Sequence, residues 1–254
     1  SVEALTAAIA DGTNALALVP SGKTGNTQRL ALTGPCGLES DARFLNMKTE
    51  DYPLTFPLFI YLPRRNQHPQ IIDFLDWLRS PSAQLVIRRA GFVDLAAVPI
   101  PIANQGERLA AAVLNAGTEV PLIELQRMMR ILTPRVRMSS TFRFEPGSTR
   151  LDGQSRSNVM QLAQAIRDGR FATRELMFVG FSDGRGPAVA NRDLSAARAE
   201  AVLRDVERAL GGNIPANVRV ETEAFGEALP MACDDTIWGQ QTNRRVELWV
   251  RDAD

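Results

Sequence analysis

A strand, a glycine-rich turn and a helix in direct succession constrain the fold of this chain most. The apolar run 176–179 leads into the turn 180–186, and apolar residues recur at helical spacing over 191–210. A short connection favours an antiparallel strand and helix. We therefore expect Asp183, in the turn, and Arg198, in the helix, at the same edge of the domain. A fixed acid beside a fixed base suits a ligand that carries both charges.

The second half of the chain alternates strands and helices around this unit. The order βαβαββ predicts an α+β sandwich with the helices on one face of the sheet. In the last strand, apolar residues alternate with Glu247, Trp249 and Arg251, which is typical of a half-buried strand. The predicted strands are 136–144, 176–181, 218–224 and 244–250, and the predicted helices are 152–166 and 191–210.

The first half predicts a smaller α/β lobe followed by a helical connector. We expect three domains or segments, 1–102, 103–134 and 135–254, and Pro134 ends the connector. The elements expected before the connector are a helix over 1–11, strands over 15–19 and 30–32, a β-rich run over 53–62, and two helices over 71–86, the second opening at Ser80-Pro81.

Composition excludes several classes of function. The chain of 254 residues has 29 basic and 29 acidic side chains, and this balance argues against binding to nucleic acid or to an anionic membrane surface. The one histidine, His68, excludes a His-rich metal site. No catalytic constellation is evident, so we expect neither enzymatic activity nor a cofactor. No apolar run approaches the roughly 18 residues of a membrane helix. The chain begins at Ser1 and is interpreted as processed or truncated.

The two cysteines, Cys36 and Cys233, lie far apart and exclude a framework of several disulfides. Three alternatives remain open for them. They form one long-range bridge that locks the two halves together, Cys36 pairs with a cysteine outside this chain, or both stay buried as thiols.

Five motifs in the second half occur in a characteristic order. They are 144–148 (Phe-Glu-Pro-Gly-Ser), 180–183 (Gly-Phe-Ser-Asp), 191–199, 225–227 (Phe-Gly-Glu) with Pro230, and 243–247 (Asn-Arg-Arg-Val-Glu). Together they resemble the OmpA-like peptidoglycan-binding domain of outer-membrane porins, Pal lipoproteins and flagellar stator proteins, over about residues 136–252. The resemblance implies noncovalent, noncatalytic binding of the peptide stem of peptidoglycan through its diaminopimelate residue. It also implies a location at the cell wall in the periplasm of a two-membrane bacterium.

The resemblance places the family's ligand-binding aspartate on Asp183 and its arginine on Arg198. Asp183 would take the free ammonium of diaminopimelate, and the planar guanidinium of Arg198 suits the free carboxylate. The N-terminus of the helix adds partial positive charge near that carboxylate. The other residues expected to shape the pocket are Ser182, Asn191 and Leu194. Of the neighbouring arginines Arg244 and Arg245, one is expected to support the site and the other to form a salt bridge.

Two further positions that are expected to belong to the site depart from the family's pattern. Phe181 stands where an imidazole is common, and Asp234 stands where an asparagine is often found. We expect Asp234 to add negative charge where the ligand carboxylate approaches. That charge would weaken binding or change which stem peptide is preferred.

The first hundred residues carry a second set of motifs, over 12–19, 52–61, 74–80, and 84–86 with 90–93. They resemble the closing part of a phosphate-type periplasmic substrate-binding protein, without its opening strands. The leading hypothesis is therefore an envelope protein that tethers a solute-binding-like module to the cell wall. The alternative is a transport receptor for phosphate or another small anion, in which the cell-wall domain is an accessory anchor.

Overall fold

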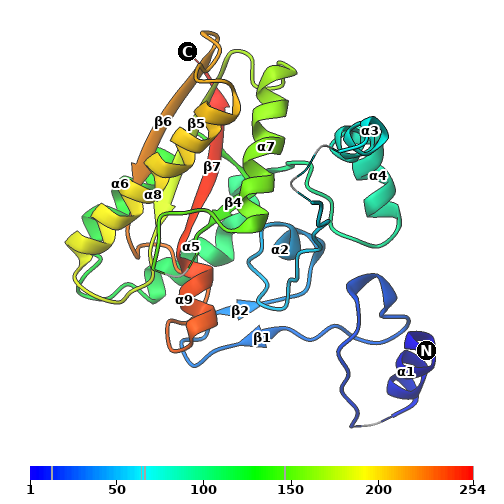
Figure 1. Ribbon diagram of the computed structural model, residues 1–254. Helices are drawn as coiled ribbons and strands as arrows, with labels where there is room; N and C mark the ends of the chain where they lie inside the picture. The colour runs from blue at the N-terminus through cyan, green and yellow to red at the C-terminus, as the bar shows by residue number, and fades with distance from the viewer. Residues whose placement is uncertain (13, 64, 66, 146, 254) are drawn as a thin grey trace.

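The centre of the computed structural model is a mixed five-stranded sheet (Figure 1). The structure describes residues 1–12, 14–63, 65, 67–145 and 147–253, so Thr13 and Pro146 of the motifs above lie outside it. The strand order is β3-β4-β7-β5-β6. The strands are β3 (Pro99–Ile100), β4 (Val136–Arg143), β5 (Arg174–Phe181), β6 (Val218–Ala224) and β7 (Arg245–Asp252).

The last strand, β7, lies in the middle of the sheet between β4 and β5. Only β5 and β6 pair in parallel, and the other neighbours are antiparallel. The four predicted strands of the second half are confirmed, whereas the short edge strand β3 was not predicted. The expectation of a half-buried β7 was wrong, because Glu247 and Trp249 are as fully buried as Val246 and Leu248.

Two helices cover one face of the sheet, as the periodicity predicted. They are α7 (Gly153–Arg167) and α8 (Ala188–Ala209). Asp152 caps α7, since its carboxylate accepts a hydrogen bond from the Ser155 amide at 2.8 Å. The core between these helices and the sheet is apolar and includes Phe142, Phe178, Val202 and Leu248.

The predicted connector covers the opposite face of the sheet. It forms α5 (Gly106–Leu114) and α6 (Leu122–Leu132), which pack on Met177, Val179 and Phe181 of β5. The expectation of helices on one face only was therefore wrong. Every residue of β5 after the first is buried, and a strand with two apolar faces needs a layer on each. The domain has three layers, with helices on both sides of the sheet.

The N-terminal part is largely extended chain joining short elements. They are α1 (Val2–Asp11), a 3₁₀ turn (Ser21–Lys23), β1 (Leu32–Thr33), β2 (Glu39–Ser40), α2 (Phe44–Lys48), α3 (Pro69–Leu78) and α4 (Pro81–Arg89). The helices predicted over 1–11 and 71–86 are confirmed. In place of the strand predicted at 30–32, the structure has the two-residue strand β1, which pairs with β2. No helix of the described residues is long and apolar enough to cross a membrane.

The strands predicted at 15–19 and 53–62 do not form within the described residues. Most side chains of both segments are exposed instead, with Leu16 at 79% and Tyr61 at 88%. A strand needs a partner for its backbone N–H and C=O groups, however strong its residue preferences are. The expected α/β lobe is therefore not formed by these segments.

Charged contacts attach part of the N-terminal region to the sheet. Asp51, which follows α2, is buried, and its carboxylate lies 3.0 Å from a guanidinium nitrogen of Arg137 and 3.2 Å from one of Arg143. Both arginines belong to β4. These ion pairs hold the segment that follows α2 against β4, the strand next to the central strand β7.

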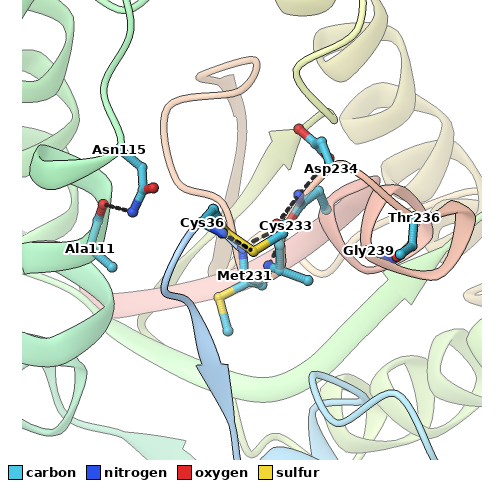
Figure 2. Close-up of a disulfide and its surroundings, with 10 residues drawn as sticks. Cys36, Ala111, Asn115, Met231, Cys233, Asp234, Thr236 and Gly239 are labelled. Atoms are coloured by element: carbon cyan, nitrogen blue, oxygen red, sulfur yellow. Dashed lines mark hydrogen bonds between the residues drawn. A yellow bond between two sulfur atoms is a disulfide. The ribbon is translucent and has the colours of Figure 1, made fainter. Parts of the chain in front are cut away.

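A disulfide between Cys36 and Cys233 provides the second attachment (Figure 2). It joins the β1–β2 turn to the loop that precedes α9 (Ile237–Asn243), and the two Cα atoms are 5.6 Å apart. Of the three alternatives for the cysteines, the structure has the long-range bridge.

We expect replacement of Cys36 by serine to loosen the N-terminal segment without unfolding the sheet. Few buried apolar side chains hold residues 21–43, whereas the strands β4–β7 lie in two apolar cores. Protease cleavage within 21–43 should rise at least about fivefold in the variant. Limited proteolysis with mass spectrometry measures this, and a reducing agent should reproduce the effect only in the wild type. Equal cleavage in both proteins would show that the bridge does not restrain this segment.

Candidate functional site

Asp183 lies directly after β5 in a turn with a defined backbone. The Ser182 amide donates a hydrogen bond to the Gly226 carbonyl oxygen at 2.8 Å, which ties the start of the turn to the end of β6. One oxygen of Asp183, Oδ1, accepts from the Arg185 amide at 3.2 Å, as in an Asx turn. The other oxygen, Oδ2, accepts from Arg244 Nη1 at 2.6 Å.

Arg198 reaches the site because α8 packs closely on β5. At Gly180 the helix backbone leaves no room for a side chain, since a Cβ atom there would lie 2.0 Å from the Ser195 carbonyl oxygen. The Ser195 hydroxyl also accepts a hydrogen bond from the Gly226 amide at 3.2 Å. Arg198, three residues further along α8, is thereby held beside the turn that carries Asp183.

The guanidinium of Arg198 is buried and incompletely partnered. The residue is 3% exposed, and its guanidinium carbon lies 5.3 Å from the centre of the Phe144 ring. Its Nε and Nη1 atoms have no hydrogen-bond partner. Burial and the charge of Arg244 lower the pKa of Arg198, and the charge of Asp183 opposes this shift. A buried donor without a partner is costly unless a ligand supplies the acceptor.

The hydroxyl of Ser182 is a second unpartnered polar group of the site. It is buried, and its Oγ atom makes no hydrogen bond. Ser182, Asp183 and Arg198 therefore present one hydroxyl, one carboxylate and two guanidinium nitrogens. This set matches a ligand with both an acceptor and a donor group.

Asn191 and Leu194 lie on the first turns of α8. Asn191 is buried, and its Nδ2 atom donates to Glu227 Oε2 at 2.6 Å. Burial raises the pKa of Glu227, and the Asn191 hydrogen bond opposes the shift, while nearby acidic groups add to it. Leu194 is 41% exposed and presents an apolar surface. Asn191 thus holds the helix to the loop after β6, a supporting role.

Asp234 does not face the site as a free carboxylate. Its Oδ2 atom accepts from the Gly184 amide at 2.6 Å, and its Oδ1 atom accepts from Asn243 Nδ2 at 2.8 Å. It adjoins the disulfide residue Cys233, as Figure 2 shows. The expectation that its charge meets the ligand carboxylate is thus not supported by this geometry. The two hydrogen bonds of its carboxylate join the turn that carries Asp183 to the segment that contains α9.

Phe181 lies on the other face of the sheet, contrary to its expected place at the site. It is fully buried in the core under α5 and α6. The Arg245 guanidinium carbon is 4.4 Å from its ring centre. Consecutive residues of a strand point to opposite faces, so Phe181 and Ser182 cannot both line one pocket. The same alternation separates Arg244, which contacts Asp183, from Arg245, whose Nε atom is 2.7 Å from Glu247 Oε1.

Two residues of the site were present in the motifs but had no assigned role. Phe144 supports the Arg198 guanidinium with its ring, and Glu227 accepts from Asn191. Their places in the motifs 144–148 and 225–227 were the available signal. No group of three or more His, Cys, Asp or Glu side chains among the described residues is arranged to hold a metal ion.

The comparison with protein families finds one match, to the OmpA family, over residues 143–244. This range contains the Asp183 turn, α8 with Arg198, and Arg244. No curated protein matches the chain.

Three of the solved structures that match the chain each cover about half of it. The peptidoglycan-associated lipoprotein from Burkholderia pseudomallei is 27% identical with a TM-score of 0.39, over 44% of this chain and 90% of that one. The C-terminal domain of Helicobacter pylori MotB is 20% identical with a TM-score of 0.37, over 43% and 82%. The cell wall anchor of the T6SS from Pseudomonas aeruginosa is 21% identical with a TM-score of 0.36, over 54% and 99%.

Proposed function

We propose that the OmpA-like domain at residues 143–244 binds peptidoglycan noncovalently and holds the chain to the cell wall. The OmpA family is a family of noncatalytic peptidoglycan-binding domains, so the proposed role is binding without chemistry. Its place is the periplasmic side of the cell envelope, where peptidoglycan lies.

The ligand group that fits the site best is diaminopimelate of the peptide stem. Its free end carries an ammonium and a carboxylate on one carbon. Asp183 supplies the acceptor for the ammonium, and the unpartnered Nε and Nη1 atoms of Arg198 supply donors for the carboxylate. Those two buried nitrogens are the observation that carries the proposal, because a ligand carboxylate would satisfy both.

The test is isothermal titration of the chain with a stem peptide that contains diaminopimelate. We expect Arg198→Ala and Asp183→Ala each to weaken binding by about tenfold to a hundredfold, since hydrogen bonds to charged groups contribute about 1.5–3 kcal/mol. Arg204→Ala is the matched control on the same helix, because Arg204 pairs with Glu200 on the exposed face of α8. Its affinity should equal that of the wild type.

Circular dichroism of each variant establishes that the domain is folded. Unchanged affinity in folded Arg198→Ala protein would exclude the assigned site.

The role of the N-terminal part stays a prediction. The leading hypothesis joins a solute-binding-like module to the cell-wall domain, and the alternative makes that module a receptor for phosphate or another small anion. The family match begins at residue 143 and gives no support to either reading. In the N-terminal part, Lys23 of the 3₁₀ turn pairs with Glu3 at 3.1 Å. Titration of the chain with inorganic phosphate tests the alternative directly.

A further inference from the structure

The ion pair between Arg244 and Asp183 affects which ligands can bind at the Asp183 carboxylate. Arg244 Nη1 lies 2.6 Å from Asp183 Oδ2, whereas Oδ1 is engaged with the Arg185 amide. The oxygen available to a ligand ammonium is therefore already occupied by a cation of the protein itself. A carboxylate oxygen has a second lone pair, so a ligand ammonium at Asp183 either shares this oxygen with the guanidinium or displaces it.

The backbone of Arg244 is anchored while its side chain is not enclosed. Its amide donates to the Gln240 carbonyl oxygen at 3.0 Å at the end of α9. The preceding residue, Asn243, is buried and holds both Ala232 and Asp234. The Arg244 side chain is 23% exposed, so it has room to leave Asp183 without moving the helix.

Positive and negative groups meet at the site, where Asp183 lies near two guanidinium groups and near the carboxylates of Glu227 and Asp234. The guanidinium groups of Arg198 and Arg244 face one carboxylate, that of Asp183. The two guanidinium groups repel each other, and the charge of Arg244 disfavours the charged form of Arg198. Displacing Arg244 from Asp183 separates this arginine from the carboxylate that it contacts.

We infer that Arg244 is a specificity-determining residue that competes with the ligand ammonium for Asp183. A ligand with an ammonium alone weakens this ion pair and offers neither guanidinium group a new anion. A ligand with an ammonium and a carboxylate on the same carbon replaces the pair and gives both arginines a new anion. The site would therefore select a stem with diaminopimelate over one with lysine, which lacks that carboxylate. This inference rests on the proposed function.

The test compares two stem peptides that differ only in the third residue, diaminopimelate or lysine. We expect the wild type to bind the diaminopimelate peptide at least about tenfold more tightly. Arg244→Gln removes the competing cation, so the lysine peptide should bind at least about threefold more tightly to this variant than to the wild type. Isothermal titration, with a competition format for the weaker peptide, measures both affinities.

Arg192→Gln is the matched control, since it removes a cation from the first turns of α8 that pairs with Glu124 at 2.8 Å. It should leave both affinities unchanged. A lysine peptide that gains no affinity in Arg244→Gln overturns the inference, even if the diaminopimelate peptide weakens, because Arg244 would then be a simple ligand contact.

The two proposals fail in different ways. Loss of diaminopimelate binding in Arg198→Ala, together with no gain for the lysine peptide in Arg244→Gln, removes only the role of Arg244. Unchanged diaminopimelate binding in Arg198→Ala removes the site itself.

Discussion

Replacing Glu247 with glutamine is expected to lower the free energy of unfolding by about 3–5 kcal/mol, the usual cost of breaking a buried ion pair. Glu247 is fully buried and contacts the guanidinium groups of Arg108 and Arg245, the latter at 2.7 Å. Arg137 lies 3.4 Å from its Oε2 atom, which also accepts from Trp249 Nε1 at 3.1 Å. Glutamine keeps the shape but leaves three buried guanidinium groups without this anion.

The pH dependence of stability is a second readout of the Glu247 variant. Burial alone raises the pKa of Glu247, but the attraction of Arg108, Arg137 and Arg245 outweighs it and holds the pKa well below its ordinary value. A carboxylate with a lowered pKa in the folded state stabilises the protein above its unfolded pKa of about 4.5, and this contribution is lost as the pH falls below that value. The variant should therefore lose less stability on acidification than the wild type.

Urea unfolding between pH 3 and pH 7, about the range in which carboxylates titrate, measures both effects. Glu200→Gln is the control, because Glu200 and Arg204 form an exposed pair that is expected to contribute less than about 0.5 kcal/mol. A Glu247→Gln protein as stable as the wild type would show that the arginines rearrange to find other partners.

Replacing Gly180 with alanine should destabilise the domain by about 3 kcal/mol or more, at the upper end of overpacking effects. A Cβ atom at this position would lie 2.0 Å from the Ser195 carbonyl oxygen, which belongs to the backbone of α8 and cannot rotate away. The helix must shift away from β5, and Arg198 shifts with it. Any folded fraction of the variant should therefore also bind the diaminopimelate peptide more weakly.

Thermal and urea unfolding measure the stability of the Gly180→Ala protein. Gly106→Ala is the matched control, because Gly106 begins α5 with helical backbone angles and a methyl group at this position would meet no atom within 4 Å. It should be neutral or stabilising by up to about 1 kcal/mol. Equal stability of the Gly180 variant and the wild type would mean that α8 is not held at this distance.

The helices and strands of the second half could be predicted because their signals are local. The apolar stripes of α7 and α8 and the four long strands follow from spacing within each segment. Helices were predicted within the connector 103–134, where α5 and α6 lie, but their place on the second face of the sheet was not predicted. The uninterrupted apolar run of β5 is typical of a strand buried on both faces. Periodicity identified the helices but did not indicate which surface they cover.

The strands expected at 15–19 and 53–62 did not form, because a strand depends on contacts outside its own segment. Their residues favour extended backbone, yet a strand forms only where another strand pairs with it. In the described residues no such partner lies beside them, and most of their apolar side chains remain exposed.

From the sequence by itself, the order of the motifs predicted Asp183 and Arg198 as the charged residues of the proposed site. Only the tertiary structure decided which group each of the neighbouring charged residues contacts. Arg244 meets Asp183 while Arg245 meets Glu247, and Asp234 is used to hold two loops together. The physical reason is that adjacent residues at the start of a strand point to opposite sides. The charge that each side chain meets is set by segments distant in the chain.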